Sequence, residues 1–372
     1  MNVSPPKTPR LFIAATRQND GKTTTSLGLL THLRRRFSSM AFMKPVGQRY
    51  LTLESGINVD KDVWLLRQTF GFNDEPTCMS PITVPSGFTK AYIDNRNIQP
   101  LEEKILRSFD TLARDREFVL LEGTGHAGVG SVFDLSNARV AQMLKSSVVL
   151  VSGGGIGKPC DEILLNYALF KNHNVPVAGV IINKVLPEKL EEIKDYVSRV
   201  LRWHDLDVLG VVPYVPLLSQ PTMREVCKEV KGEFIAGDDR SATLFSDVVF
   251  VSHFSSELAR NVAPRTLVAA VGDQSDLLIA CAGEEPEMQP LHENTAGILL
   301  VDGIMPKAHI ISMLQHNGIP VILSELSAFA ATSRVARLIA KIQPDNPEKI
   351  TEIDRLFTDY VDIDRMLEMS CV

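Results

Sequence analysis

The sequence lacks the features that mark several classes of protein. Its five cysteines are scattered, with no Cys-x-x-C pair and no cluster of cysteine and histidine, so neither a zinc site nor a disulfide framework is indicated. No stretch approaches the roughly 18 apolar residues of a membrane span, and residues 1–10 lack the apolar segment of a signal peptide. Positive charge is not in excess, since 39 lysines and arginines face 45 aspartates and glutamates. The formal net charge of −6 argues against a general nucleic-acid or anionic-membrane binder.

What remains is the composition of an ordinary folded chain. Hydrophobic residues occupy 44% of the 372 positions and charged residues 23%, which provides enough apolar surface for sizeable cores. At about 150 residues per domain, this length predicts two to three domains. Scattered thiols fit a reducing compartment, and we therefore expect a cytoplasmic protein.

Short apolar runs alternate with amphipathic segments through the first part of the chain. Strands buried on both faces are predicted at 11–15, 41–43, 118–121, 148–151, 177–182 and 208–212. Helices are predicted at 23–36, 62–69, 101–114, 138–145, 161–171 and 188–203. This alternation predicts an α/β fold with right-handed crossovers and a mostly parallel sheet. Residues 71–97, rich in Pro, Gly, Thr and Ser, interrupt the pattern, and we interpret them as a flap.

A second series of elements follows a proline-rich segment at 213–216. Strands are predicted at 248–251, 266–270, 277–281, 297–301 and 321–323, and helices at 307–316 and 332–341. We therefore expect a first domain over 1–218, a second α/β domain over 219–345, and a C-terminal helical tail over 346–372.

The strongest chemical signal lies at residues 16–23, Thr-Arg-Gln-Asn-Asp-Gly-Lys-Thr, between a predicted strand and a predicted helix. A P-loop needs this context, because backbone N–H groups at a helix N-terminus bind phosphate oxygens. Lys22 is expected to reach the β- and γ-phosphates, Thr23 to bind Mg²⁺ and Thr24 to meet the α-phosphate. The residues predicted to bind the nucleotide in this segment are Thr16, Asn19, Gly21, Lys22, Thr23 and Thr24.

The first position of this motif is Thr16 where the common pattern has glycine. The alternative interpretation is an ordinary helix start, with Asp20 as N-cap and Gly21 present for the geometry of the turn. Because the strand, the helix and the Gly-Lys-Thr core are all in place, we favour nucleotide binding.

Carboxylates at other predicted strand ends are candidates for the metal. Glu122 ends the strand at 118–121, and side chains at the carboxyl ends of parallel strands face the ligand crevice. Asp60 and Asp62 precede the helix at 62–69, and either is a candidate to join Thr23 and Glu122 around Mg²⁺. The alternative for all three carboxylates is local capping of a turn or a helix.

Two further polar residues end predicted strands. Lys44 follows the strand at 41–43, where a lysine neutralises a phosphoryl or carboxylate oxygen; its alternative is a solvated surface lysine. Asn183 closes the strand at 177–182 and is expected to hydrogen-bond the edge of an adenine; its alternative is a turn asparagine.

Together these motifs resemble the dethiobiotin synthetase family and, more widely, the amidoligase and cobyrinate-synthase relatives that share its P-loop fold. The T-x-x-x-x-G-K-T of that family is matched at 16–23, with threonine first. Its K-P-V, E-G-x-G, G-x-x-x-N and L-G-x-x-P elements are matched at 44–46, 122–125, 179–183 and 209–213. The order and spacing hold from residue 10 to about residue 215.

The resemblance implies an α/β P-loop NTPase fold that uses ATP and Mg²⁺. It implies phosphate binding by Thr16, Gly21, Lys22 and Thr23, magnesium binding by Thr23, Asp62 and Glu122, charge stabilisation by Lys44 and a base contact by Asn183. Arg17 stands where dethiobiotin synthetases usually carry Asp, so we expect a substrate other than diaminopelargonate.

The second domain resembles the DRTGG domain, which occurs beside a dethiobiotin-synthetase-like module in the N-terminal part of many bacterial phosphate acetyltransferases. The resemblance lies in segments 221–225, 272–276, 297–305 and 319–323, with Gln274 and Val301-Asp302-Gly303 departing from the family pattern. The chain ends where an acetyltransferase domain would begin, so we do not expect acetyl transfer.

Two functions follow from these motifs. As an Mg-ATP-dependent ligase, the protein would let a substrate carboxylate or carbamate attack the γ-phosphate, with Lys22, Lys44 and Arg17 neutralising charge. His126 is then a candidate base, or else a hydrogen-bonded loop histidine.

The alternative is a non-catalytic, nucleotide-sensing module that regulates a partner metabolic enzyme. A partitioning-type ATPase is disfavoured, because Arg17 replaces its signature lysine and no basic DNA-binding stretch is present. We expect a small-molecule substrate or effector, no nucleic-acid or membrane partner, and a homo-oligomer, a dimer or larger.

Overall fold

The chain folds into two compact units, which we describe separately. The structure is a computed structural model that describes residues 8–255, 257, 261–284, 289–338 and 340–370. Unit 1 comprises the residues up to Tyr214 together with those from Pro347 onward, and unit 2 comprises Val215–Asn346. The segment predicted as a C-terminal tail is therefore part of unit 1 from Pro347 onward, so that unit 2 is an insertion between two stretches of unit 1.

Unit 1 is built on a six-stranded parallel sheet with the order β10-β9-β8-β1-β7-β2. Nearly every residue of the central strands is apolar and buried, because helices cover both faces. All six predicted strands are confirmed. The strands are β1 (Arg10–Ala15), β2 (Met40–Met43), β7 (Phe118–Glu122), β8 (Ser147–Gly153), β9 (Val177–Val185) and β10 (Val208–Pro213).

The helices of unit 1 follow from the crossovers. The chain moves across the sheet in one direction from β1 to β2 and in the other from β2 through β7, β8 and β9 to β10, so right-handed connections place α1 on one face and α5–α8 on the other. The predicted helices are confirmed within a few residues at their ends. They are α1 (Lys22–Leu33), α2 (Lys61–Phe70), α5 (Gln99–Ala113), α6 (Asn137–Met143), α7 (Gly157–Asn172) and α8 (Leu190–Arg202).

Short elements occupy the stretch between β2 and α5. Two small sheets pair β3 with β6 and β4 with β5, the latter as a hairpin that leads into α2. The segment predicted as a flap contains short helices and one of these strands. The elements are β3 (Val46–Gly47), β4 (Tyr50–Thr52), β5 (Asn58–Asp60), α3 (Pro76–Met79), β6 (Ile82–Thr83) and α4 (Phe88–Asp94).

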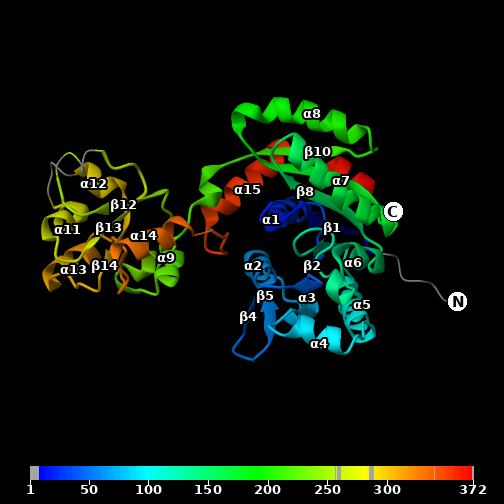
Figure 1. Cartoon of the computed structure of the whole chain (residues 1–372), viewed down its shortest axis with the longest axis horizontal. Coiled ribbons are helices and arrows are strands. Elements are labelled where there is room, and N and C mark those ends of the chain that lie inside the picture. Colours follow the sequence, from blue (N-terminus) through cyan, green and yellow to red (C-terminus); the bar gives the residue numbers. More distant parts are fainter. Residues whose placement is uncertain (1–7, 256, 258–260, 285–288, 339, 371–372) are drawn as a thin grey trace. The chain divides into compact units, whose positions relative to one another are not determined.

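The C-terminal segment supplies two helices to the face that carries α1. They are α15 (Pro347–Tyr360), which packs beside α1 and β10, and α16 (Ile363–Ser370), which packs on β8, β9 and β10 (Figure 1). The ring of Phe357 lies directly against Gly28 of α1, where a Cβ atom would overlap it. Val361 forms an antiparallel bridge with Gly210, so the returning chain also pairs with part of the edge strand β10.

Unit 2 contains a five-stranded sheet with the order β11-β15-β14-β13-β12, in which only β11 is antiparallel. Consecutive residues of its central strands belong to different cores: Leu267 and Ala269 pack with α9 and α14, whereas Val268 and Ala270 pack with α11 and α13. The strands are β11 (Glu233–Ala236), β12 (Asp247–Val251), β13 (Thr266–Val271), β14 (Thr295–Val301) and β15 (Val321–Leu323). The helices are α9 (Met223–Val230), α11 (Ser275–Ala282), α12 (Gln289–Asn294), α13 (Ala308–His316) and α14 (Ala328–Ala336).

One predicted strand of unit 2 is wrong. Residues 277–281 form α11, which ends at Gly283 in the left-handed conformation. A short helix that is buried almost all round has the same continuous apolar run as a buried strand, so the pattern does not separate the two. The short strand β11 contains three consecutive apolar residues, Phe234, Ile235 and Ala236, and was not predicted.

Among the residues that the structure describes, no helix has both the length and the apolar character needed to cross a membrane.

The contact between α1 and α15 predicts that unit 1 depends on its C-terminal helices. Phe357 is 2% exposed, so Phe357→Ala is expected to lower the free energy of unfolding by about 3–5 kcal/mol, from lost burial and the cavity left behind. Denaturant unfolding followed by tryptophan fluorescence measures this, because both tryptophans, Trp64 and Trp203, lie in unit 1. Arg355→Ala, on the exposed side of the same helix, should change stability by less than about 0.5 kcal/mol.

Candidate nucleotide-binding site

The sequence-predicted residues meet at the carboxyl edge of the six-stranded sheet. Strand β1 lies between β7 and β8. The chain crosses from β1 toward β2 on one side, and later crosses from β7 over β1 to β8 on the other side, so the order of the strands reverses at β1. In open parallel sheets, ligands bind at the carboxyl edge where the order reverses. The loop of residues 16–21 leaves β1 at this edge. Lys44 follows β2, Glu122 ends β7 and Asn183 lies near the end of β9.

Side-chain hydrogen bonds fix the start of the loop. Asp20, only 8% exposed, accepts hydrogen bonds from the Thr16 hydroxyl (2.7 Å) and the Arg17 backbone N–H (2.8 Å). The alternative in which Asp20 caps α1 is therefore wrong, since the N-cap is Gly21 and no side chain caps the helix. Asn19 and Gly21 both have left-handed backbone conformations, with φ of 69° and 106°. The loop is thus a tight, internally bonded turn.

The end of β9 holds the loop from the other side. Asn183 donates from Nδ2 to the backbone oxygen of Asp20 (2.9 Å), and Lys184 donates from Nζ to that of Asn19 (2.7 Å). A Cβ atom at Gly21 would overlap the Asn183 amide, so glycine is required here for space as well as for its positive φ. Asn183 supports the loop in this structure, and its contact with an adenine remains a prediction.

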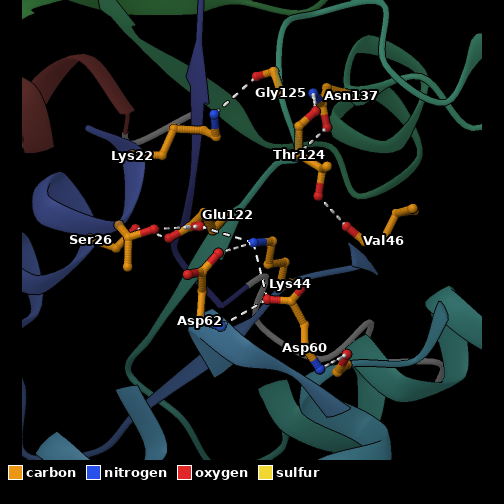
Figure 2. Close-up of polar contacts among 12 residues, drawn as sticks. Lys22, Ser26, Lys44, Val46, Asp60, Asp62, Glu122, Thr124, Gly125 and Asn137 are labelled. Atoms are coloured by element: carbon orange, nitrogen blue, oxygen red, sulfur yellow. Dashed lines mark hydrogen bonds and ion pairs between the residues drawn. The ribbon is translucent and has the colours of Figure 1, made fainter. Parts of the chain in front are cut away.

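Lys22 begins α1 and is largely buried. Its ammonium group donates to the backbone oxygen of Gly125 (3.2 Å), in the loop after β7, as Figure 2 shows. Burial lowers the pKa of Lys22, and Glu122 partly opposes that shift. The lysine therefore connects the start of α1, directly after the 16–21 loop, with the loop after β7.

Lys44 is the centre of an ion cluster (Figure 2). Its ammonium group lies 3.1 Å from Asp60 and 3.4 Å from Glu122, and it also hydrogen-bonds Asp62. Burial alone would lower the pKa of Lys44, but Asp62, Asp60 and Glu122 outweigh burial and raise it well above its ordinary value. With a side chain only 6% exposed, Lys44 is not the solvated surface lysine of the alternative interpretation.

The carboxylates of this cluster have distinct second contacts. Glu122, fully buried, accepts from the Ser26 hydroxyl (2.7 Å) and lies 3.4 Å from the Thr23 hydroxyl, which links the cluster to α1. Asp60 caps α2 by accepting from the Asp62 N–H (2.9 Å), as the capping alternative for this residue predicts. Burial raises the pKa of both Glu122 and Asp60, and Lys44 counteracts both shifts.

Two of the predicted magnesium ligands, Asp62 and Glu122, belong to this cluster, and the third, Thr23, lies 3.4 Å from Glu122. A hydroxyl and two carboxylates are hard oxygen donors of the kind Mg²⁺ prefers, so their chemistry fits the ion. Within the described part of the chain, no group of three or more His, Cys, Asp or Glu side chains is arranged to hold a metal. The magnesium site therefore remains a prediction, in which phosphate oxygens and water supply the missing ligands.

Two buried asparagines that the sequence motifs do not include fix the loop after β7. Asn137 bonds the backbone of Thr124 and His126 through three hydrogen bonds of 2.7–3.1 Å. Asn166 accepts from the Ala127 N–H (2.8 Å) and donates to the Thr16 backbone oxygen (3.4 Å), so it joins this loop to the start of the 16–21 loop. Both lie in helices, and only their burial in the folded chain distinguishes them from surface asparagines.

The flanking charged residues are engaged locally. Arg17 pairs with Glu162 of α7 (2.7 Å). His126 is exposed, and its ring accepts from the Gly128 N–H (3.2 Å), as in the loop-histidine alternative.

Comparison with known proteins agrees with this architecture. A family model described as an AAA domain, AAA_26, matches residues 9–222, which is more than half of the chain. The chain belongs to this AAA_26 family. A second model, the DRTGG domain, matches residues 225–338. The AAA_26 chain is thus a P-loop NTPase domain with a mostly parallel sheet joined to a DRTGG domain, as predicted.

Curated relatives of the AAA_26 chain are phosphate acetyltransferases. That of Nitratidesulfovibrio vulgaris is 26% identical over 363 residues, which cover 95% of this chain and 50% of the relative. That of Synechocystis is 23% identical over 372 residues, covering 97% and 51%. The chain spans about half the length of these relatives.

Solved structures give weaker similarities. The MinC:MinD cell division complex of Aquifex aeolicus matches 56% of this chain and 83% of its own with a TM-score of 0.38 and 14% identity. The CBS and DRTGG domains of Clostridium perfringens pyrophosphatase match 44% of this chain and 81% of their own with a TM-score of 0.27 and 13% identity. At these values neither bears on function.

The ion cluster predicts a large and pH-dependent cost for removing Lys44. Lys44→Met leaves the buried carboxylates without their cation and should lower the free energy of unfolding by about 3–5 kcal/mol near pH 8. The pKa values of Glu122 and Asp60 should then rise further, so the deficit is greatest above those values and shrinks as the pH falls and the carboxyl groups take up protons. Denaturant unfolding at several pH values with EDTA present measures this deficit.

The matched control is Lys90→Met, which removes an exposed lysine of α4. Its stability should stay within about 0.5 kcal/mol of the unchanged protein across the same pH range. A Lys44 variant as stable as this control would show that the cluster contributes nothing to the fold.

Proposed function

We propose that unit 1 binds ATP together with Mg²⁺ at the 16–21 loop and the start of α1. The observation that carries the proposal is the arrangement of the loop backbone. Its carbonyl groups at Asn19 and Asp20 are bound by Lys184 and Asn183, while within the described residues the N–H groups of residues 18, 19, 21 and 22 donate no hydrogen bond. Unpaired N–H groups at a helix N-terminus, next to a lysine, make an anion site suited to a polyphosphate.

Each predicted residue then has a definite role. Lys22 exchanges its contact with the Gly125 carbonyl for the β- and γ-phosphates, and Thr24 meets the α-phosphate. Thr23, Asp62 and Glu122 hold Mg²⁺, which neutralises phosphate charge when bound. Thr16, Asn19 and Gly21 shape the loop, and Asn183 contacts the base with the part of its side chain that does not support the loop.

Substitution of the loop lysine tests this proposal. Lys22→Ala removes the cation that faces the phosphates and should weaken Mg-ATP binding by about 100-fold or more, since a buried charge-assisted bond contributes several kcal/mol. Isothermal titration calorimetry on the full chain measures the dissociation constant. Lys158→Ala, at an exposed lysine 72% accessible on α7, should bind ATP like the unchanged protein. Equal affinity in the two variants would refute the assignment.

A second candidate function, phosphoryl transfer, is favoured by the position of Lys44. A buried ammonium group beside Glu122 and Asp62 is placed to stabilise negative charge when a carboxylate or carbamate attacks the γ-phosphate. That attack would form an acyl phosphate and release ADP, and a nucleophile would then displace inorganic phosphate. ATP turnover against a panel of carboxylate and amine metabolites, with mass spectrometry of the products, tests it.

The chain is similar to about half the length of each phosphate acetyltransferase relative, and this similarity favours a regulatory function over phosphoryl transfer. The similarity runs through both the AAA_26 and DRTGG regions, which is the arrangement expected of a nucleotide-sensing module that acts on a partner metabolic enzyme. If ATP hydrolysis stays flat across the panel while ATP changes association with such an enzyme, regulation is the function. A multiple-turnover product would instead establish the ligase. The homo-oligomer and the cytoplasmic location remain predictions.

A further inference from the structure

Helix α8 carries two large aromatic side chains on a side of the helix that does not face the sheet. Its buried residues are Ile193, Val197 and Leu201, and the helix packs against β10 and α7. Tyr196 and Trp203 are 46% and 76% exposed. Their spacing corresponds to about two turns of helix, so both rings lie on one face. Trp203 follows the last helical residue but keeps helical angles (φ −64°, ψ −15°), which extends this face to the end of α8.

Charged residues complete this face. Arg199 lies over the Tyr196 ring, with its guanidinium carbon 5.4 Å from the ring centroid, and pairs with Asp195 (3.3 Å). Glu192, one turn before Tyr196, is exposed. The helix therefore carries acidic groups in its first turn and basic groups in its last turn, with Tyr196 between them. We call Glu192, Tyr196, Arg199 and Trp203 the α8 stripe.

The composition of the α8 stripe is typical of a protein interface. Tryptophan, tyrosine and arginine are the residue types that contribute most to binding in many interfaces, whereas exposed apolar side chains elsewhere on a surface are scattered singly. The order of the charges identifies the partner, because a helix with acid at its start and base at its end is complementary to a copy of itself that runs antiparallel. Contact of one surface patch with the same patch of a second copy is the commonest arrangement of a homodimer.

We infer that the α8 stripe is a homodimer interface, in which α8 of one copy packs antiparallel on α8 of a second copy. Glu192 lies four residues before Tyr196 and Arg199 three residues after it, so a two-fold axis near Tyr196 places Glu192 of each copy opposite Arg199 of the second copy. Trp203 then meets the start of the second copy's helix, where the exposed Lys189 is available for a cation–π contact. All of these residues lie in unit 1, and the inference does not depend on nucleotide binding.

Removal of the exposed indole is the first test. Trp203→Ala should raise the dissociation constant of the dimer by about 30-fold or more, the effect of truncating a residue that dominates an interface. Sedimentation equilibrium of the full chain at increasing concentration measures this constant, and the fluorescence of Trp64 verifies that the variant is folded. Lys194→Ala, at an exposed lysine of α8 outside the stripe, is the control and should dimerise like the unchanged protein. A chain that stays monomeric up to about 0.1 mM, or a dimer equally tight in both variants, overturns the inference.

An exchange of charges tests the antiparallel pairing itself. Glu192→Arg places arginine opposite Arg199, and Arg199→Glu places glutamate opposite Glu192, so each variant alone should dimerise about tenfold or more weakly than the unchanged protein. Mixing the two variants makes every facing pair opposite in charge again, and the mixture should recover dimers that neither variant forms alone. Lys194→Glu, which reverses a charge outside the stripe, should dimerise normally by itself. A mixture as monomeric as its separate components shows that Glu192 and Arg199 do not meet, and overturns the inference.

Discussion

The ammonium group of Lys44 is the interaction on which the arrangement of the site depends. It brings together carboxylates from three places in the chain: Asp60 at the end of β5, Asp62 in α2 and Glu122 at the end of β7. Glu122 then connects to α1 through Ser26 and Thr23. Each of these charges would be costly to bury alone, so the elements that carry them are confined to positions in which all of them are paired.

The same pairing limits what the site does without nucleotide. Lys44, the cation nearest the predicted metal ligands, already pairs with three carboxylates. Lys22 donates a hydrogen bond to the Gly125 carbonyl. In the proposed binding, a nucleotide and its metal ion would therefore have to exchange these existing contacts for new ones. Part of the binding energy would then be available to move the β7 loop and α1, whose positions depend on those contacts.

The positions of the site residues followed from the sequence to a large extent, because parallel strands bring their carboxyl ends to one edge. Lys44, Glu122 and the 16–23 motif meet there for that reason. The internal bonding of the loop did not follow. Asp20 suits a helix cap by residue type, and its bonds to Thr16 and Arg17 depend on a left-handed turn at Asn19 that no local preference specifies. Asn166 was missed for a similar reason, since its role requires two loops that are distant in sequence.

In the fold, too, features set by neighbouring residues could be predicted, whereas features set by residues distant in the sequence could not. Apolar runs predicted the strands of unit 1, but they failed at 277–281, where a buried helix has the composition of a buried strand. The amphipathic pattern of the C-terminal residues predicted helices without indicating the surface that they cover, because that surface is formed by the first part of the chain. The contact between Gly28 and Phe357, together with the bridge between Val361 and Gly210, identifies it.

This discontinuous arrangement has a consequence for the order of folding. Unit 2 is a continuous stretch and has its partners available as soon as residue 346 is synthesised. Unit 1 begins first, but it lacks the cover on one face of β8–β10 until α15 and α16 emerge, and contacts such as that between Gly28 and Phe357 close a very long loop. Contacts of such sequence separation form slowly, so unit 1 becomes complete last although its first residues are made first. During synthesis unit 2 is therefore the first part of the molecule to become stable. The outer edge of strand β10 stays unpaired until Val361 is made and pairs with Gly210.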